Sequence, residues 1–168
     1  SWVNRRSHPI SYSYNPSGRL TNKVFADGSR AVYAYDPRGN LTNATTLDSG
    51  LGTLDYSVMS YDSNDRLTNI TSTGGKWLSF TYDTAGRRAS SLDQLGHRLG
   101  YYYDGVGRLE SMTNELDQLV VRYEYDPAGR LARKTLGNGM TATCGYDATG
   151  QLLALTNRLV NGTAISRF

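Results

Sequence analysis

Apolar and aromatic residues occupy every second position in several short segments of the chain, and each segment ends in a tyrosine. The pattern recurs in Ile10–Tyr14, Ala31–Tyr35, Leu78–Tyr82, Leu99–Tyr103 and Val121–Tyr125. A period of two places alternate side chains on the same face of a β-strand. We therefore predict strands with one half-buried face, and we find no pattern that predicts a helix of useful length.

The tyrosines that end these segments recur at regular intervals, and a similar octet begins at each. The spacings are 21, 26, 21, 21, 22 and 21 residues. The octet is Tyr-Asp-x-x-Gly-Arg-Leu followed by a variable residue, as in YDPAGRLA from Tyr125. Exceptions include Asn15 for Asp, Asp65 for Gly, and Asn40 and Gln151 for Arg. Self-similarity at a fixed period indicates about seven tandem repeats.

The Asp-x-x-Gly part of each octet predicts a tight turn. Asp accepts hydrogen bonds from later backbone amides, Pro37 and Pro127 preset φ, and Gly supplies a positive φ. We predict a type I turn closed by a left-handed residue, with Leu starting the return strand. The structural repeat motif comprises Tyr14, Gly18, Tyr35, Asp36, Gly39, Tyr61, Asp62, Tyr82, Asp83, Gly86, Tyr103, Asp104, Gly107, Tyr125, Asp126, Gly129, Tyr146, Asp147 and Gly150.

A second turn closes each repeat at Asp27-Gly28, Gly74-Gly75, Leu95-Gly96 and Asn138-Gly139. The five extra residues of the longest interval are expected in the turn within Leu47–Gly52. The predicted fold is all-β: a strip of stacked antiparallel hairpin repeats of about 21 residues each, forming a curved or spiralling sheet. We expect one domain over residues 1–168, as a fragment of a larger shell.

Composition narrows the possible functions. Hydrophobic residues make up 38% of the chain, which contains 13 tyrosines and has a net charge of +3. Because the charges are interspersed, we expect no nucleic-acid partner. No apolar run is long enough to span a membrane. The start, Ser1–Arg6, lacks the apolar core of a signal peptide, so an export signal is expected elsewhere.

We expect no catalytic residues, metal or cofactor. The repeated aspartates could be Ca²⁺ ligands, but their position favours local hydrogen bonds in the turns. Cys144, the one cysteine, takes the place of an aromatic residue in other repeats and is interpreted as a small core residue. A row of tyrosines and arginines could bind a glycan; alternatively, these arginines pair with acidic residues on neighbouring strands or are solvated. The arginines are Arg19, Arg66, Arg87, Arg108 and Arg130.

The recurring octet resembles the YD repeat, also called the RHS repeat, over roughly residues 10–160. Similar repeats occur in Rhs polymorphic toxins, in the C subunits of insecticidal toxin complexes and in teneurin shells. The resemblance implies a β-sheet strip that spirals into a hollow shell, which in the toxins encloses a toxic domain and in teneurins serves cell adhesion. It also implies that the repeats are not catalytic and that the protein is secreted or at the bacterial cell surface.

No segment here resembles the closing core or the toxic domain of those toxins, so we expect the shell to need further repeats. The leading hypothesis is a non-catalytic shell segment whose partners are the rest of the shell or an enclosed toxin domain. Two alternatives are a carbohydrate-binding or adhesion module, and a repeat protein that self-associates through unpaired sheet edges.

Overall fold

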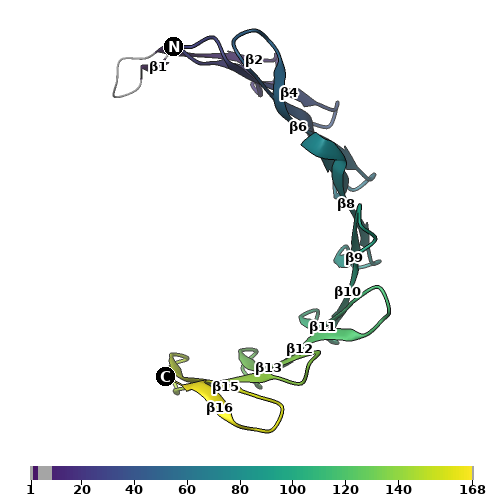
Figure 1. The fold of residues 1–168 in the computed structure, drawn as a ribbon, viewed down its shortest axis with the longest axis vertical. Coiled ribbons are helices and arrows are strands. Elements are labelled where there is room, and N and C mark those ends of the chain that lie inside the picture. The colour runs from purple at the N-terminus through teal and green to yellow at the C-terminus, as the bar shows by residue number, and fades with distance from the viewer. Residues whose placement is uncertain (1, 4–8, 168) are drawn as a thin grey trace. The chain divides into compact units, whose positions relative to one another are not determined.

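The computed structural model describes residues 2–3 and 9–167, and its contacts divide the chain into two units, Ser1–Phe80 and Thr81–Phe168 (Figure 1). Most of Ser1–Arg6, on which the signal-peptide prediction depends, lies outside the described residues. We describe each unit by itself, and the single-domain organisation stays a prediction.

The first unit is built from antiparallel strands, each paired with the next strand in the chain. A single turn of 3-10 helix, η1 (Thr73–Gly75), joins its last two strands. The strands are β1 (Trp2–Val3), β2 (Pro9–Tyr14), β3 (Leu20–Val24), β4 (Arg30–Tyr35), β5 (Leu41–Leu47), β6 (Thr53–Tyr61), β7 (Leu67–Ser72) and β8 (Lys76–Tyr82), which crosses the unit boundary.

The second unit repeats this arrangement of neighbouring antiparallel strands. Its strands are β9 (Arg88–Asp93), β10 (Arg98–Tyr103), β11 (Leu109–Thr113), β12 (Leu119–Tyr125), β13 (Leu131–Leu136), β14 (Thr141–Tyr146), β15 (Leu152–Arg158) and β16 (Ala164–Arg167). The prediction of an all-β fold made of antiparallel hairpins is confirmed.

Each octet forms a three-residue hairpin turn. In the turn after β12, the Asp126 amide donates to the Arg130 carbonyl and the Gly129 amide donates to the Asp126 carbonyl, both at 2.9 Å. Gly129 has a φ of 82°, in the left-handed region. These bonds and this φ are those of the predicted type I turn with a left-handed closing residue. Asp65, which replaces the glycine in the third octet, takes the same conformation with a φ of 60°.

The longest interval between tyrosines is accommodated in the strands, so the prediction of a lengthened turn is wrong. The Asp48 amide donates to Gly52 at 2.9 Å and the Leu51 amide donates to Asp48 at 3.0 Å, the same pair of bonds as in the other turns. The flanking strands are longer instead: β5 has 7 residues and β6 has 9. Longer strands satisfy the added backbone groups in the ladder, whereas a longer loop would leave them to solvent.

A β-bulge follows six of the octet turns, on the return strand. Tyr35 lies opposite Leu41 while Ala34 lies opposite Asn43, so Thr42 is the extra residue. The same register shift occurs beside Tyr14, Tyr61, Tyr103, Tyr125 and Tyr146. A bulge bends the strand locally and interrupts the ladder of hydrogen bonds. The interruption lies beside a backbone carbonyl that accepts a hydrogen bond from the tyrosine of the next repeat, as at Leu20, which accepts from Tyr35.

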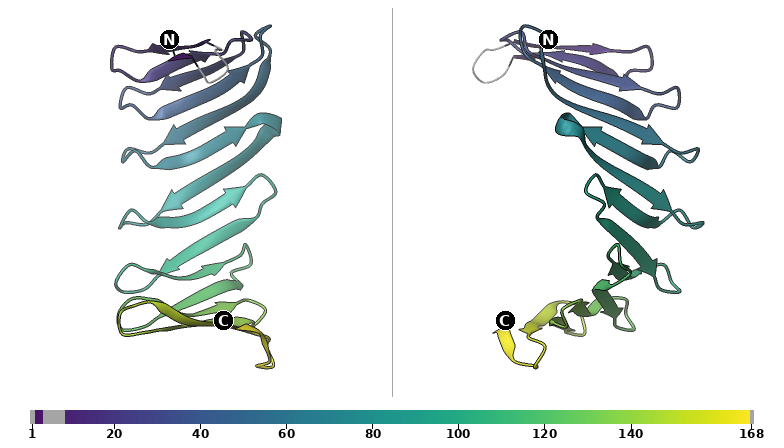
Figure 2. Two further views of the ribbon diagram at one scale, coloured as in Figure 1. Left: turned by 90° about the vertical axis from the view of Figure 1, so that its left-hand side faces the viewer. Right: turned by 45° about the vertical axis from the view of Figure 1, so that its right-hand side comes forward.

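Each unit is a single layer of strands with turns along both edges (Figure 2). We name one side the tyrosine face. Of the described residues, Val121 at 5% exposure is the one hydrophobic side chain classed as buried, and none is fully buried. The tyrosine face comprises Ala31, Tyr33, Tyr35, Met59, Tyr61, Ile70 and Leu78 in the first unit, and Leu99, Tyr101, Tyr103, Met112, Val121, Tyr123, Tyr125, Lys134, Leu136, Ala142, Cys144, Tyr146 and Leu155 in the second.

The turn geometry predicts different costs for two glycines of one octet. Gly107 has a φ of 89°, where an L-residue is strained. The Gly107→Ala variant should therefore have an unfolding free energy about 1–2 kcal/mol lower than the parent protein. Gly105, in the same turn, has no positive φ, and apart from its chain neighbours no residue lies within 4 Å of where its Cβ would be, so Gly105→Ala is the matched control. Urea denaturation measures both; equal stabilities would contradict the turn assignment.

Candidate functional site: the contact between successive repeats

The repeat arginine is held by the aspartate of its own turn. Asp126 accepts from the Arg130 amide at 2.8 Å through Oδ1 and from Arg130 Nε at 2.6 Å through Oδ2. The charge-assisted hydrogen bond from Nε holds the guanidinium beside the carboxylate of its own turn. The same pair of bonds joins Asp62 to Arg66, Asp83 to Arg87 and Asp104 to Arg108. The acidic partner of these arginines is therefore within the turn.

The oriented guanidinium lies over the tyrosine of the next repeat. The distance from Cζ to the ring centre is 4.3 Å for Arg108 over Tyr125 and 4.6 Å for Arg130 over Tyr146. Arg87 lies over Tyr103 at 4.4 Å. Such cation–π pairs are worth about 0.5–1 kcal/mol at exposed sites. In these three octets Asp83, Asp104 and Asp126 thus position an arginine that links two repeats.

The same tyrosine also bonds the backbone of the preceding repeat. The Tyr125 hydroxyl donates to the Leu109 carbonyl at 2.8 Å, in the return strand that follows Arg108. Tyr35, Tyr61, Tyr103 and Tyr146 donate to the corresponding carbonyls of Leu20, Leu41, Arg88 and Leu131 at 2.8–3.0 Å. We name the combination the Asp–Arg–Tyr contact: aspartate and arginine of one octet, tyrosine of the next, and its bond to the carbonyl beside the bulge.

The first octet shows what the aspartate contributes. Asn15 takes its place and accepts only backbone amides, those of Ser17 and Arg19. Without a carboxylate to hold it, the Arg19 guanidinium lies 6.0 Å from the centre of the Tyr35 ring, farther than in the octets that have Asp. It passes instead directly over Gly39, where a Cβ atom would collide with it.

The octet glycine lies next to the arginine of the preceding repeat. The arginine of the preceding repeat passes beside it: Arg130 Nη1 lies 3.8 Å from where a Cβ of Gly150 would be, and Arg108 Nη1 lies 3.6 Å from that position at Gly129. At these two positions a Cβ would make only ordinary van der Waals contact, so the positive φ is what favours glycine; at Gly39 the arginine also excludes a Cβ.

Arg38 is a functional residue that sequence reasoning missed. It precedes Gly39 in the octet in which Asn40 replaces the repeat arginine, and it donates to the carbonyls of Asp62 and Ser63 at 2.8 and 2.9 Å. It also pairs with Asp65 at 3.1 Å, and Asn40 donates to the same carboxylate at 2.6 Å. A different set of side chains thus joins these two octets. The sequence signal for this different contact was the departure from the octet pattern in two consecutive octets, at Asn40 and at Asp65.

These hydrogen bonds lower the pKa values of the turn aspartates. The Arg66 side chain is the largest cause of the lowered pKa of Asp62, and its amide adds to it. For Asp126, the Arg130 amide is the largest cause of the lowered pKa; partial burial opposes it and the Arg130 guanidinium reinforces it. Each carboxylate is therefore ionised over the physiological range and serves as a fixed acceptor.

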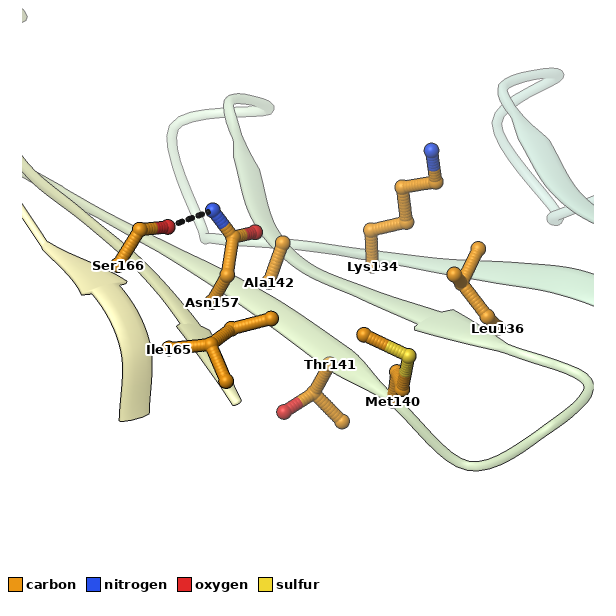
Figure 3. Close-up of a pocket in the computed structure, with 8 residues that line it drawn as sticks. All are labelled: Lys134, Leu136, Met140, Thr141, Ala142, Asn157, Ile165 and Ser166. Carbon is orange, nitrogen blue, oxygen red and sulfur yellow. Dashed lines mark hydrogen bonds between the residues drawn. The ribbon is translucent and has the colours of Figure 1, made fainter. Parts of the chain in front are cut away.

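A small pocket opens on the tyrosine face of the second unit (Figure 3). Its volume is about 160 Å³, and an Asn157–Ser166 hydrogen bond of 2.8 Å closes one side. A space of this size holds a benzene-sized group, such as one apolar side chain of a polypeptide that covers this face. The lining residues are Lys134, Leu136, Met140, Thr141, Ala142, Asn157, Ile165 and Ser166.

The geometry defines a class of protein: a tandem hairpin-repeat sheet in which neighbour contacts between repeats take the place of a core. Residues 57–158 match the Teneurin YD-shell family, and residues 14–51 match the RHS Repeat family. The first match covers more than half of the chain. The chain therefore belongs to the YD/RHS repeat family, within its Teneurin YD-shell group. No curated protein matches the sequence.

Solved toxin-complex structures show the same fold. The chain is similar to the crystal structure of TcdB2-TccC3-TEV, with a TM-score of 0.63 at 15% identity over 94% of this chain and 10% of that chain. The Photorhabdus luminescens Tc holotoxin pore gives a TM-score of 0.62 at 15% identity, again over 94% and 10%. This chain thus spans about a tenth of those chains. Within the described residues no helix is long and apolar enough to cross a membrane.

The tyrosine hydroxyl is expected to contribute to stability where it bonds the preceding repeat. Tyr125→Phe removes the donor to the Leu109 carbonyl and should lower the unfolding free energy by about 1 kcal/mol. Tyr102→Phe is the matched control, because Tyr102 is 45% exposed and lies on the opposite face. Thermal and urea denaturation compare the two variants. If Tyr125→Phe is no less stable than Tyr102→Phe, the hydroxyl bond does not hold the repeats together.

Stability is expected to fall in acid. The folded pKa of Asp62, Asp83, Asp104 and Asp126 lies below the ordinary value of 3.8, so these groups stabilise the fold above that pH. Their contribution is lost as pH falls below 3.8 through the folded pKa values. Melting temperatures between pH 7 and pH 2 measure the effect.

Asp126→Asn is the matched control for this titration, since Asn15 shows that asparagine can bond the turn amides. The variant should be less stable than the parent at neutral pH and should lose less stability in acid. A parent protein with constant stability below pH 3.8 would contradict the role of the carboxylates.

Proposed function

We propose that the chain is a non-catalytic structural segment of a YD/RHS β-shell that encloses or presents a toxin or effector domain. The observation that carries the proposal is the series of Asp–Arg–Tyr contacts, which use the repeated polar groups to join one hairpin to the next. Asp126, Arg130 and Tyr146 all engage one another or the backbone. Groups held in this way serve assembly of a sheet.

The tyrosine face supports the second part of the proposal, that the segment faces another polypeptide. A single-layer sheet normally buries its apolar face against another layer. Here Leu78 is 43% exposed and the pocket beside Met140 is open, so the face can receive apolar side chains. Family membership favours an enclosed toxin domain or the rest of the shell as that layer, and a secreted or cell-surface location.

The alternative of a glycan bound by the row of repeat arginines finds less support in the geometry. Arg108 already bonds Asp104 and lies over Tyr125, so a ligand would have to break both interactions. Self-association through the outer edges of β1 and β16 stays a prediction. It agrees with β16 being exposed along its whole length.

Binding of an unfolded polypeptide tests the proposal. Reduced, carboxymethylated α-lactalbumin is a permanently unfolded probe, and fluorescence anisotropy measures its affinity for the chain. Leu78→Glu places a charge on the tyrosine face and should weaken binding at least about tenfold, because a charge resists burial against apolar groups. Val58→Glu is the matched control: Val58 is 41% exposed in the same unit but faces the opposite side, between Asn43 and Thr71.

Little change on Val58→Glu together with strong weakening on Leu78→Glu would support a tyrosine face that contacts the enclosed chain. Equal effects of the two variants, or no binding by the parent protein, would contradict that role.

A further inference from the structure

The side of the second unit opposite the tyrosine face carries a regular array of arginines and threonines. Two rows cross the strands by register: one runs Arg122, Thr135, Thr141, Arg158, and the other runs Arg133, Thr143, Thr156, Arg167 from β13 to β16. We name these eight residues the arginine face. None of them belongs to the octets or to the Asp–Arg–Tyr contacts.

The arginines of the arginine face carry unneutralised charge, whereas its Thr156 is buried, with 8% exposure. Arg122, Arg133, Arg158 and Arg167 are all exposed. Among the residues that the structure describes, none of the four forms an ion pair. Glu124 is the acidic residue on this side of β12 to β16; it lies opposite Arg133 without approaching to ion-pair distance. This side therefore has an excess of positive charge beside the partly exposed hydroxyls of Thr135, Thr141 and Thr143.

The spacing of the array suits an extended ligand. In each row the two arginines are three strands apart, which corresponds to about 14 Å at the usual distance between strands. Arg122 and Arg133 are diagonal neighbours on β12 and β13, and Arg158 and Arg167 are diagonal neighbours on β15 and β16. Two arginine pairs thus flank the threonine pairs Thr135–Thr141 and Thr143–Thr156.

We propose that the arginine face binds an acidic polysaccharide that carries carboxylate or sulfate groups. A guanidinium matches the planar oxygens of a carboxylate with two parallel hydrogen bonds. A threonine hydroxyl both donates and accepts, so it can bond the hydroxyls of a sugar. Arginine pairs at the two ends of the array bind the anionic groups, and the half-buried Thr135, Thr141 and Thr143 between them contact the sugar rings.

The geometry favours a polysaccharide over a nucleic acid. Single-stranded nucleic acids bind through bases stacked on aromatic side chains, and the tyrosines of these strands, Tyr123, Tyr125 and Tyr146, belong to the other face. The proposal goes beyond the shell role and does not depend on an enclosed domain, because it concerns the opposite side of the sheet.

The test uses the whole chain, with labelled heparin as the sulfated probe and polygalacturonate as the carboxylated probe. Affinity is measured at an ionic strength of about 0.15 M, so that weak long-range attraction is screened. Arg133→Gln should weaken binding to at least one probe by about tenfold, because it removes hydrogen bonds to a charged group. Glu124→Gln should strengthen binding up to about fivefold, because it removes a nearby like charge.

Lys134→Gln is the matched control. Lys134 neighbours Arg133 on β13 and its replacement removes the same charge, but it lies on the tyrosine face opposite Tyr123 and Ala142. We expect this variant to bind like the parent protein, and circular dichroism to show that all three variants are folded.

Three results would overturn the proposal. The parent protein could fail to bind either probe, Lys134→Gln could weaken binding as much as Arg133→Gln, or a single-stranded DNA of equal charge could bind more tightly than both polysaccharides. Tighter heparin binding by Glu124→Gln supports the proposal independently, since a loss of folding cannot strengthen binding.

Discussion

The contact between an arginine and the tyrosine of the next repeat is the interaction on which the rest of this structure depends. A hairpin by itself is marginally stable in water, and these sheets bury no side chain fully among the described residues. Repeat-to-repeat interactions therefore supply what a core supplies in a globular domain. The aspartate orients the guanidinium, the tyrosine receives it, and the tyrosine hydroxyl bonds the backbone beside the bulge.

This arrangement explains why the octet is polar although it is the most regular part of the sequence. In a globular protein, a repeated pattern of apolar residues defines the packed layer. Here the apolar alternation defines only which residues lie on the tyrosine face. The Asp, Gly and Arg positions define how each hairpin contacts the next. Stability in such repeat proteins is approximately a sum of terms for single repeats and for neighbouring pairs. Each Asp–Arg–Tyr contact is one such neighbour term.

The strands and turns were predictable from the sequence, because both follow local rules. The period of two identified the strands that end at Tyr103 and Tyr125, and Asp-x-x-Gly identified the turns. The contact between repeats was not predictable, since an octet carries no information about which side chains of the next octet lie within reach. The bulge at Thr42 illustrates the difficulty. It shifts the alternation by one residue, so simple counting from Leu41 would place Asn43 on the tyrosine face, whereas Ala44 lies there opposite Tyr33.

The substitute contact made by Arg38, Asn40 and Asp65 has a consequence for how the repeats can evolve. Tandem arrays change by unequal recombination, which moves whole repeats and suits a chain whose joints are interchangeable. The joint between the second and third octets is not interchangeable, because Arg38 and Asn40 stand on one side of it and Asp65 on the other. A crossover at this joint would leave Asp65 facing an ordinary octet, without its cation. These two octets are therefore expected to be inherited as a pair.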